Sequence, residues 1–218
     1  MLRTIRRPSL LLAAPALLSL FSVGCGSSSS SNTLSAAQAQ AVSEQVSETV
    51  ATGMSNAFNQ SGSTVRTTRP SLSHFSRRAH PTDLSGCVGS DGQFNCEVPI
   101  TATANCANGG TMSVAGDATG ILDSNGDGSL TTRLTITPAQ CAVDGLVLNG
   151  DPNIMVNTAL NFTNNGIVAP VSLSATGGIT YGSHSSQSCQ VNVIYSIDSS
   201  GACTSVGTVC GQPVSGSC

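Results

Sequence analysis

Residues 87–218 alternate between apolar and polar or small side chains with a period of two, and this pattern constrains the fold more than any other feature of the chain. The clearest runs are at 94–102, 154–162, 167–173 and 189–197. Alternation of this kind is typical of strands that bury one face. We therefore expect a mainly β domain.

Turn-forming pairs such as Asp-Gly, Asn-Gly and Gly-Gly separate the alternating runs. They divide the domain into expected strands at 93–102, 110–122, 129–137, 143–149, 154–162, 166–175, 177–183, 188–197 and 204–210. Short strands at regular spacing with tight turns favour an antiparallel meander, arranged as a sandwich, an open barrel or a half-barrel.

The side chains that could fill this β core are small. The chain has no tryptophan, and aromatic residues make up 3% of it. A core of small side chains buries little apolar area per residue, so covalent cross-links contribute more to stability than usual.

The spacing of the cysteines predicts such cross-links. In an antiparallel hairpin, residues equidistant from the turn face each other within reach of a disulfide. Three cysteine pairs are centred on turn sequences near 90–93, 123–128 and 198–201, and the fourth pair follows by elimination. No Cys-x-x-Cys sequence is present, which disfavours a metal–thiolate site. The predicted bridges are Cys87–Cys96, Cys106–Cys141, Cys189–Cys210 and Cys203–Cys218.

The ninth cysteine, Cys25, follows a basic stretch at 1–7 and an apolar run at 10–21. The apolar run is within the length range of signal peptides and too short to span a bilayer. The sequence Ser-Val-Gly-Cys at 22–25 resembles the lipobox of bacterial lipoprotein precursors, in which the cysteine is acylated and becomes the mature N-terminus.

The lipobox resemblance implies a fatty-acyl anchor, such as palmitate, on Cys25 and a place in the bacterial cell envelope. Ser27, rather than an aspartate, stands close behind Cys25, which implies the outer membrane under that family's sorting rule. The alternative is ordinary secretion, because Ser22 and Gly24 also suit signal peptidase I. Lipidation of Cys25 leaves an even number of cysteines to pair, whereas simple secretion leaves an unexplained thiol.

Composition divides the chain into five segments. These are a signal peptide at 1–24, the lipidated cysteine and a Ser-rich tether at 25–33, an amphipathic helix at 34–60, an Arg/Ser/Thr-rich linker at 61–86 and the disulfide-stapled β domain at 87–218.

The helix is indicated by a capping box, in which Ser35 is followed three residues later by Gln38. An apolar side chain recurs at every fourth position from Val42 to Phe58. Such a stripe drifts slowly around a helix, so we expect it to pack across a twisted sheet. The alternative is a weakly ordered stalk helix, since Gly53 and several Ser, Thr and Asn residues lower the helix propensity.

The charge of the chain limits the classes of ligand that it can bind. It has no lysine, and the part after residue 24 carries five arginines against eleven acidic residues. A domain this acidic repels the negatively charged phosphate backbone of a nucleic acid, so we expect no nucleic-acid binding. Four of the arginines lie at 66–78, with His74 and His80 nearby, where they could contact anionic lipid. The alternative is a solvated basic loop.

One motif carries ligand-type chemistry. Oxygens at Asp123, Asn125 and Asp127, followed by Gly128, resemble the first half of a calcium-binding loop. Leu134 stands where such a loop needs a carboxylate, and the same residues suit a hairpin turn. The alternatives are a plain turn and a weak calcium site.

A calcium site on this loop would need further oxygens, for which Asp117 and Asp144 are candidates. Calcium is the only cofactor that the sequence suggests.

Nucleophilic catalysis has little support. The chain has no Gly-x-Ser-x-Gly elbow, and nothing in the spacing selects a serine and a carboxylate to act with His184. We therefore expect a non-enzymatic, membrane-anchored envelope lipoprotein with a structural or binding role, whose protein, glycan or lipid partner is not specified by the sequence. The alternatives are a calcium-assisted adhesin or glycan-binding module and a secreted hydrolase.

The order of elements resembles that of the lipid-carrier half-barrel lipoproteins, which implies a sheet wrapped around helical elements. A carrier needs an apolar cavity of about 300 Å3 or more between sheet and helix. A concave face filled by residues 34–59 favours a structural or adhesive role instead.

Overall fold

The computed structural model describes residues 33–58, 72, 86–150, 153–163, 166–182 and 187–218. From Thr33 onward the chain forms one compact unit. Cys25 with its leader, the arginines at 66–78, His74, His80 and His184 lie outside the described residues, so what the sequence predicts for them stays a prediction.

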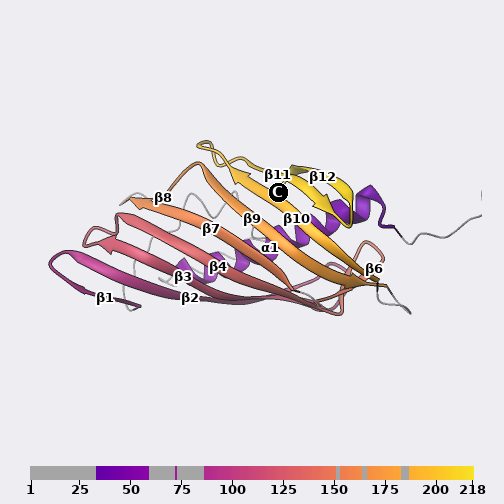
Figure 1. Cartoon of the computed structure of the whole chain (residues 1–218), viewed down its shortest axis with the longest axis horizontal. Coiled ribbons are helices and arrows are strands. Elements are labelled where there is room, and N and C mark those ends of the chain that lie inside the picture. Colours follow the sequence, from indigo (N-terminus) through magenta and orange to yellow (C-terminus); the bar gives the residue numbers. More distant parts are fainter. Residues whose placement is uncertain (1–32, 59–71, 73–85, 151–152, 164–165, 183–186) are drawn as a thin grey trace, which may run out of the picture. The chain divides into compact units, whose positions relative to one another are not determined.

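Helix α1, Ala36–Phe58, begins at the predicted capping box (Figure 1). The Ser35 N–H donates to Gln38 Oε1 at 3.0 Å, and the Gln38 N–H donates to Ser35 Oγ at 3.2 Å. The predicted apolar stripe is at most 4% exposed; it consists of Val42, Val46, Val50, Met54 and Phe58. The prediction of an amphipathic helix is confirmed. The stalk interpretation is wrong, because the stripe packs against the sheet.

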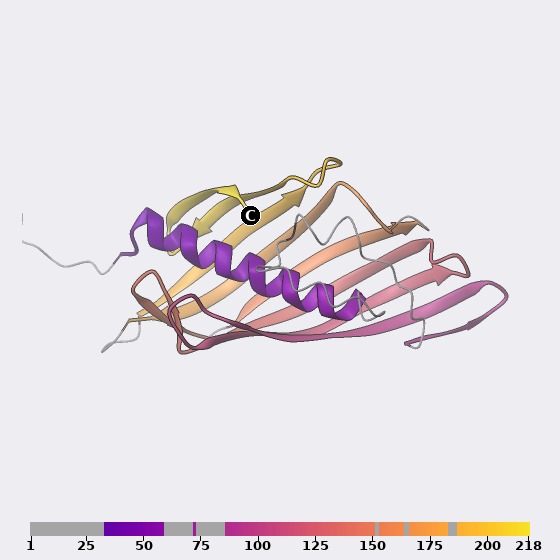
Figure 2. The same cartoon turned by 180° about the vertical axis from the view of Figure 1, so that it is seen from behind.

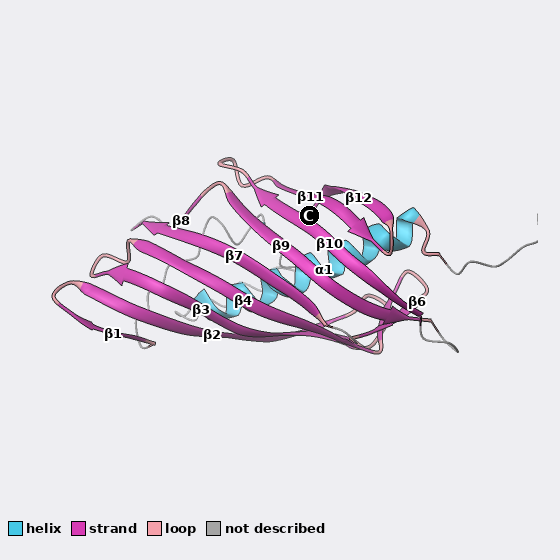
Figure 3. Cartoon of the chain, viewed as in Figure 1, coloured by secondary structure: helices cyan, strands magenta, loops and turns pink. Residues whose placement is uncertain are grey.

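Twelve strands form one antiparallel sheet (Figure 3). They are β1 Cys87–Ser90, β2 Gln93–Asn105, β3 Thr111–Asp123, β4 Gly128–Ala139, β5 Cys141–Val143, β6 Leu146–Asn149, β7 Ile154–Thr163, β8 Gly166–Val168, β9 Val171–Tyr181, β10 Gln187–Ile197, β11 Cys203–Val209 and β12 Gln212–Ser217. The order β1-β2-β3-β4-β7-β9-β10-β11-β12 follows the chain, so the sheet is an open meander. The predicted fold class is confirmed in its open form.

Three of the strand predictions need correction. The segment at 143–149 is divided by a turn at Asp144 and Gly145, both with positive φ, into the short strands β5 and β6, which pair with each other. The expected break at the Gly177-Gly178 pair does not occur, and β9 runs through it. A side chain at Gly177 would overlap the carbonyl oxygen of Asn153, so this glycine permits a close strand contact rather than a turn.

The short edge strands β1 and β12 were not among the expected strands. The expected continuous strand at 166–175 is wrong, because the chain divides it into β8 and β9 at the cis peptide bond between Ala169 and Pro170. No helix within the described ranges has the length and apolar character that crossing a membrane requires.

Helix α1 lies across one face of the sheet (Figure 2). It contacts β2 and β3 towards one edge and β11 and β12 at the other. A buried hydrogen bond adds to this packing, because the Tyr195 hydroxyl on β10 donates to the Ser43 carbonyl oxygen at 2.8 Å. The same hydroxyl oxygen lies 3.2 Å from Ser43 Oγ. The helix is therefore fixed to the sheet by an apolar stripe and a polar contact.

The four predicted disulfides are present, with Cα–Cα distances of 3.9 to 5.4 Å. Cys87 and Cys96 face each other in the β1–β2 register, as the hairpin argument requires. The Cys218 N–H donates to the Cys203 carbonyl at 3.2 Å, at the end of the β11–β12 hairpin. These bridges staple the edge strands to the sheet.

The geometric reason given for Cys106 and Cys141 is only partly correct. The two residues do not face each other within one hairpin: Cys106 lies in the turn before β3, and Cys141 begins β5, just after β4. The Ala142 N–H donates to the Gly109 carbonyl at 2.8 Å, which continues the pairing beyond the hairpin. This extension brings the two cysteines together.

Candidate functional site

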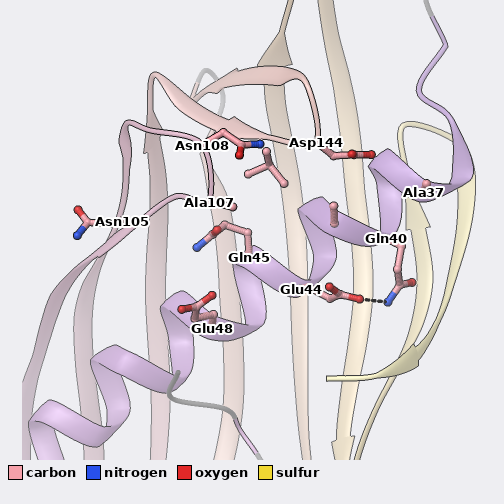
Figure 4. Close-up of a pocket in the computed structure, with 11 residues that line it drawn as sticks. Ala37, Gln40, Glu44, Gln45, Glu48, Asn105, Ala107, Asn108 and Asp144 are labelled. Carbon is pink, nitrogen blue, oxygen red and sulfur yellow. Dashed lines mark hydrogen bonds between the residues drawn. The ribbon is translucent and has the colours of Figure 1, made fainter. Parts of the chain in front are cut away.

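A polar groove of about 640 Å3 lies between α1 and two turns of the sheet (Figure 4). One turn joins β2 to β3 at 106–110, and the other joins β5 to β6 at Asp144 and Gly145. The polar side chains that line it are Gln40, Glu44, Gln45, Glu48, Asn105, Asn108 and Asp144.

The helix places its groove residues by its own periodicity. The apolar stripe of α1 faces the sheet, and the exposed and half-buried positions of the helix lie on the opposite face. Gln40, Glu44 and Glu48 recur every four residues and share one face of the helix. Gln40 Nε2 donates to Glu44 Oε1 at 3.1 Å. This spacing produces a row of amide and carboxylate groups along one wall of the groove.

The start of the helix is tied to the opposite wall of the groove. Gln38 Nε2 donates to the Asp144 carbonyl oxygen at 3.3 Å. Asp144 itself is exposed and has a φ of 46° in the β5–β6 turn. The contact holds a carboxylate-bearing turn beside the first turns of α1.

Gln45 is the unusual residue of the groove. Its side chain is only 5% exposed, and its Nε2 is buried without a hydrogen-bond partner among the described residues. Ser47 Oγ, Asp127 Oδ1 and Asn153 Oδ1 are also buried without a hydrogen-bond partner among the described residues, but none of these residues lines the groove. A buried donor without an acceptor costs about 1–3 kcal/mol, so such groups are rare in folded proteins.

The groove is acidic. Glu44, Glu48 and Asp144 line it, and among the residues that the structure describes no basic side chain does. Arg133 is the one lysine or arginine within the described ranges, and it lies on the exposed face of β4, opposite Asp117 in the β3–β4 register. A concave surface lined by one sign of charge attracts groups of the opposite sign. The arrangement therefore suits a cationic ligand.

The calcium-type motif forms the β3–β4 turn. Asp123 Oδ1 accepts the N–H of Asn125 at 2.8 Å and the N–H of Asp127 at 2.9 Å. These backbone hydrogen bonds, chiefly the one from Asp127, hold the pKa of Asp123 below its usual value. An aspartate that bonds its own following backbone is typical of a turn.

The other oxygens that a calcium site would need do not converge on this turn. Asp117 is six residues away along β3, about 20 Å for an extended strand, and Asp144 lies at the polar groove. Within the described ranges no group of three or more His, Cys, Asp or Glu side chains is arranged to hold a metal ion. The structure thus favours the turn, and calcium binding at Asp123, Asn125 and Asp127 stays an untested prediction.

The sequence interpretation missed the groove. Its helix wall was detectable in principle, because Glu44 and Glu48 are spaced by four on the face opposite the apolar stripe. The position of Asp144 next to them follows only from the tertiary fold. No family model, curated protein or solved structure matches this chain, so its own residues and fold are the guide to its function.

Proposed function

We propose that this chain is a non-enzymatic lipoprotein of the bacterial envelope, anchored through acylated Cys25, whose disulfide-stapled domain binds a partner at its surface. The position of α1 is the observation that supports binding at the surface rather than carriage of an apolar ligand inside the domain. The helix stripe from Val42 to Phe58 is at most 4% exposed, so the helix occupies the space that a carrier would keep for an apolar ligand.

The cysteine pairing supports the anchor. All eight cysteines from Cys87 to Cys218 are joined in disulfides, which leaves Cys25 as the unpaired one in the sequence. A cysteine at the end of a signal peptide that has no disulfide partner is free to carry a lipid. Acyl chains at that position would hold the domain at a membrane surface.

Metabolic labelling tests the anchor. The full chain is expressed in a Gram-negative host that is fed an alkyne-tagged palmitate. We expect the label on the wild-type chain and its loss in Cys25→Ser, together with release of that variant into the soluble periplasmic fraction. Ser22→Leu is the matched control, because it alters the same segment and keeps Cys25; its label should persist. An unlabelled, freely soluble wild-type chain would refute the anchor.

Lipid uptake tests surface binding against carriage. Native mass spectrometry of the Cys25→Ser chain, purified from cells, should give the mass of the polypeptide alone. A stoichiometric bound lipid would show that the sheet and helix separate to hold a ligand, and it would favour the carrier interpretation instead.

A further inference from the structure

Two kinds of group in the acidic groove between α1 and the β2–β3 and β5–β6 turns lack a partner. Gln45 Nε2 is a buried donor with no acceptor among the described residues. The carboxylates of Glu44, Glu48 and Asp144 line the same groove, and none of the described residues places a basic side chain there. A ligand that pairs with both kinds of group carries positive charge for the carboxylates and a hydrogen-bond acceptor for Gln45.

The spacing of the carboxylates selects the form of such a ligand. Glu44 and Glu48 are one turn apart on α1, which is about 6 Å along the axis at a rise of 1.5 Å per residue. An extended peptide rises about 3.3 Å per residue, so its alternate side chains recur every 6.6 Å or so. Basic side chains at alternate peptide positions therefore match the two carboxylates.

Gln45 supplies the second contact. It follows Glu44 directly in the helix and lies against the β2–β3 turn, beside Ala107 (Figure 4). Gln45 lines the groove, and because the terminal torsion of a glutamine side chain has a broad range, its amide can turn Nε2 towards a ligand there. A backbone carbonyl of a peptide lying along α1 would then accept from Nε2.

The geometry points to an extended, basic peptide segment of a partner protein as the ligand of this groove. This inference rests on the surface-binding role proposed above and names its ligand class. The groove volume, about 640 Å3, is in the range of protein binding pockets. A free polyamine matches the charges but has no acceptor for Gln45, so the buried amide favours a peptide.

Fluorescence anisotropy tests the assignment with defined probes. The full secreted chain carries Cys25→Ser so that it stays in solution. The probe is a labelled seven-residue peptide that alternates lysine and alanine, and its matched control has glutamate in place of each lysine. We expect binding of the basic peptide alone, weakening as salt is raised from 50 to 300 mM because the charges are screened.

Substitutions separate the two contacts. Glu44→Gln and Glu48→Gln should each weaken binding about two- to fivefold at low salt and less at high salt. Gln45→Met, which keeps the side-chain size, should weaken it about three- to tenfold at both salt concentrations. Glu97→Gln is the matched control, since it makes the same chemical change on an exposed position of β2 away from the groove; it should bind as the wild type does.

Three results would overturn the proposal. They are equal affinities of the Glu44→Gln/Glu48→Gln double variant and Glu97→Gln, no effect of Gln45→Met, and tighter peptide binding when the arginines at 66, 69, 77 and 78 are replaced by serine. The last result would assign the groove to this chain's own arginines. Because the assay uses an unlipidated chain, its failure leaves the Cys25 anchor intact, and loss of the palmitate label leaves the peptide assay valid.

Discussion

Replacing Gly53 with alanine tests how closely α1 approaches the sheet. Gly53 is buried in the helix, and a methyl group added there would lie 2.6 Å from Val114 Cγ1 and 3.3 Å from Ile100 Cγ2. Carbon atoms pack best at about 3.5–4.0 Å. Valine cannot easily turn its branched side chain aside, so the overlap has to be relieved by moving the helix or the strand.

Two opposing terms set the result of Gly53→Ala. Alanine favours the helix over glycine by about 1 kcal/mol. Forcing an extra methyl group into a packed core costs about 1–3 kcal/mol. The overlap with Val114 places this site towards the upper part of that range, so we expect a net loss of about 1–2 kcal/mol in the free energy of unfolding.

The assay is urea-induced unfolding of the oxidised chain, with two further variants. Asn56→Ala, at an exposed position one turn along, reports helix propensity alone and should stabilise by about 0.5 kcal/mol. In a Val114→Ala background the obstructing methyl group is absent, so Gly53→Ala should there become neutral or stabilising. If Gly53→Ala stabilised the wild-type chain by the full propensity term, the close approach of helix and sheet would be refuted.

The remaining predictions concern Tyr195, Asp123 and the binding of calcium. Tyr195→Phe removes the hydrogen bond to Ser43 and should lower the free energy of unfolding by about 1 kcal/mol in urea titrations, and unchanged stability would contradict a role for that bond. Burial also raises the pKa of Tyr195 above its usual range, so the unfolded chain loses the phenolic proton first. Stability should therefore fall as the pH rises beyond about 10, and the melting temperature of Tyr195→Phe should fall less over the same pH range. The backbone N–H groups of Asp127 and Asn125 lower the pKa of Asp123, so its contribution is present above the unfolded pKa and is lost as the pH falls. Asp123→Asn should reduce the drop in melting temperature between pH 5 and pH 2.5, and an identical drop in both chains would argue against those contacts. Calcium should leave the melting temperature unchanged; a rise that Asp127→Asn abolishes would establish the calcium site instead.

Local patterns accounted for much of the fold. The period-two alternation marked most of the strands, and the Ser35–Gln38 pair marked the start of α1, because both depend on neighbours within a few residues. Cysteine spacing also predicted the disulfides, since hairpin geometry makes residues equidistant from a turn neighbours in space. The Cys203–Cys218 bridge is the exception, because it was predicted only by elimination, after the other three pairs had been assigned.

Other features were set by contacts that no local pattern contains. The Gly177-Gly178 pair has turn chemistry, yet β9 continues through it because the backbone of Asn153 comes too close for a side chain. The turn at Asp144 is different, because its Asp-Gly pair is itself a local hairpin signal that the expected strand at 143–149 passed over. At Gly177, by contrast, a partner elsewhere in the chain decided the local conformation.

By itself, the sequence determined that the chain forms an antiparallel sheet, one helix and four disulfides, because periodicity, capping and turn spacing are short-range properties. Only the tertiary structure decided where α1 lies. By lying across the face of the sheet, the helix buries its stripe and brings Glu44, Gln45 and Glu48 beside Asp144, about a hundred residues away in the chain. A groove made from such distant segments has no sequence signature, since its charge and shape arise from packing.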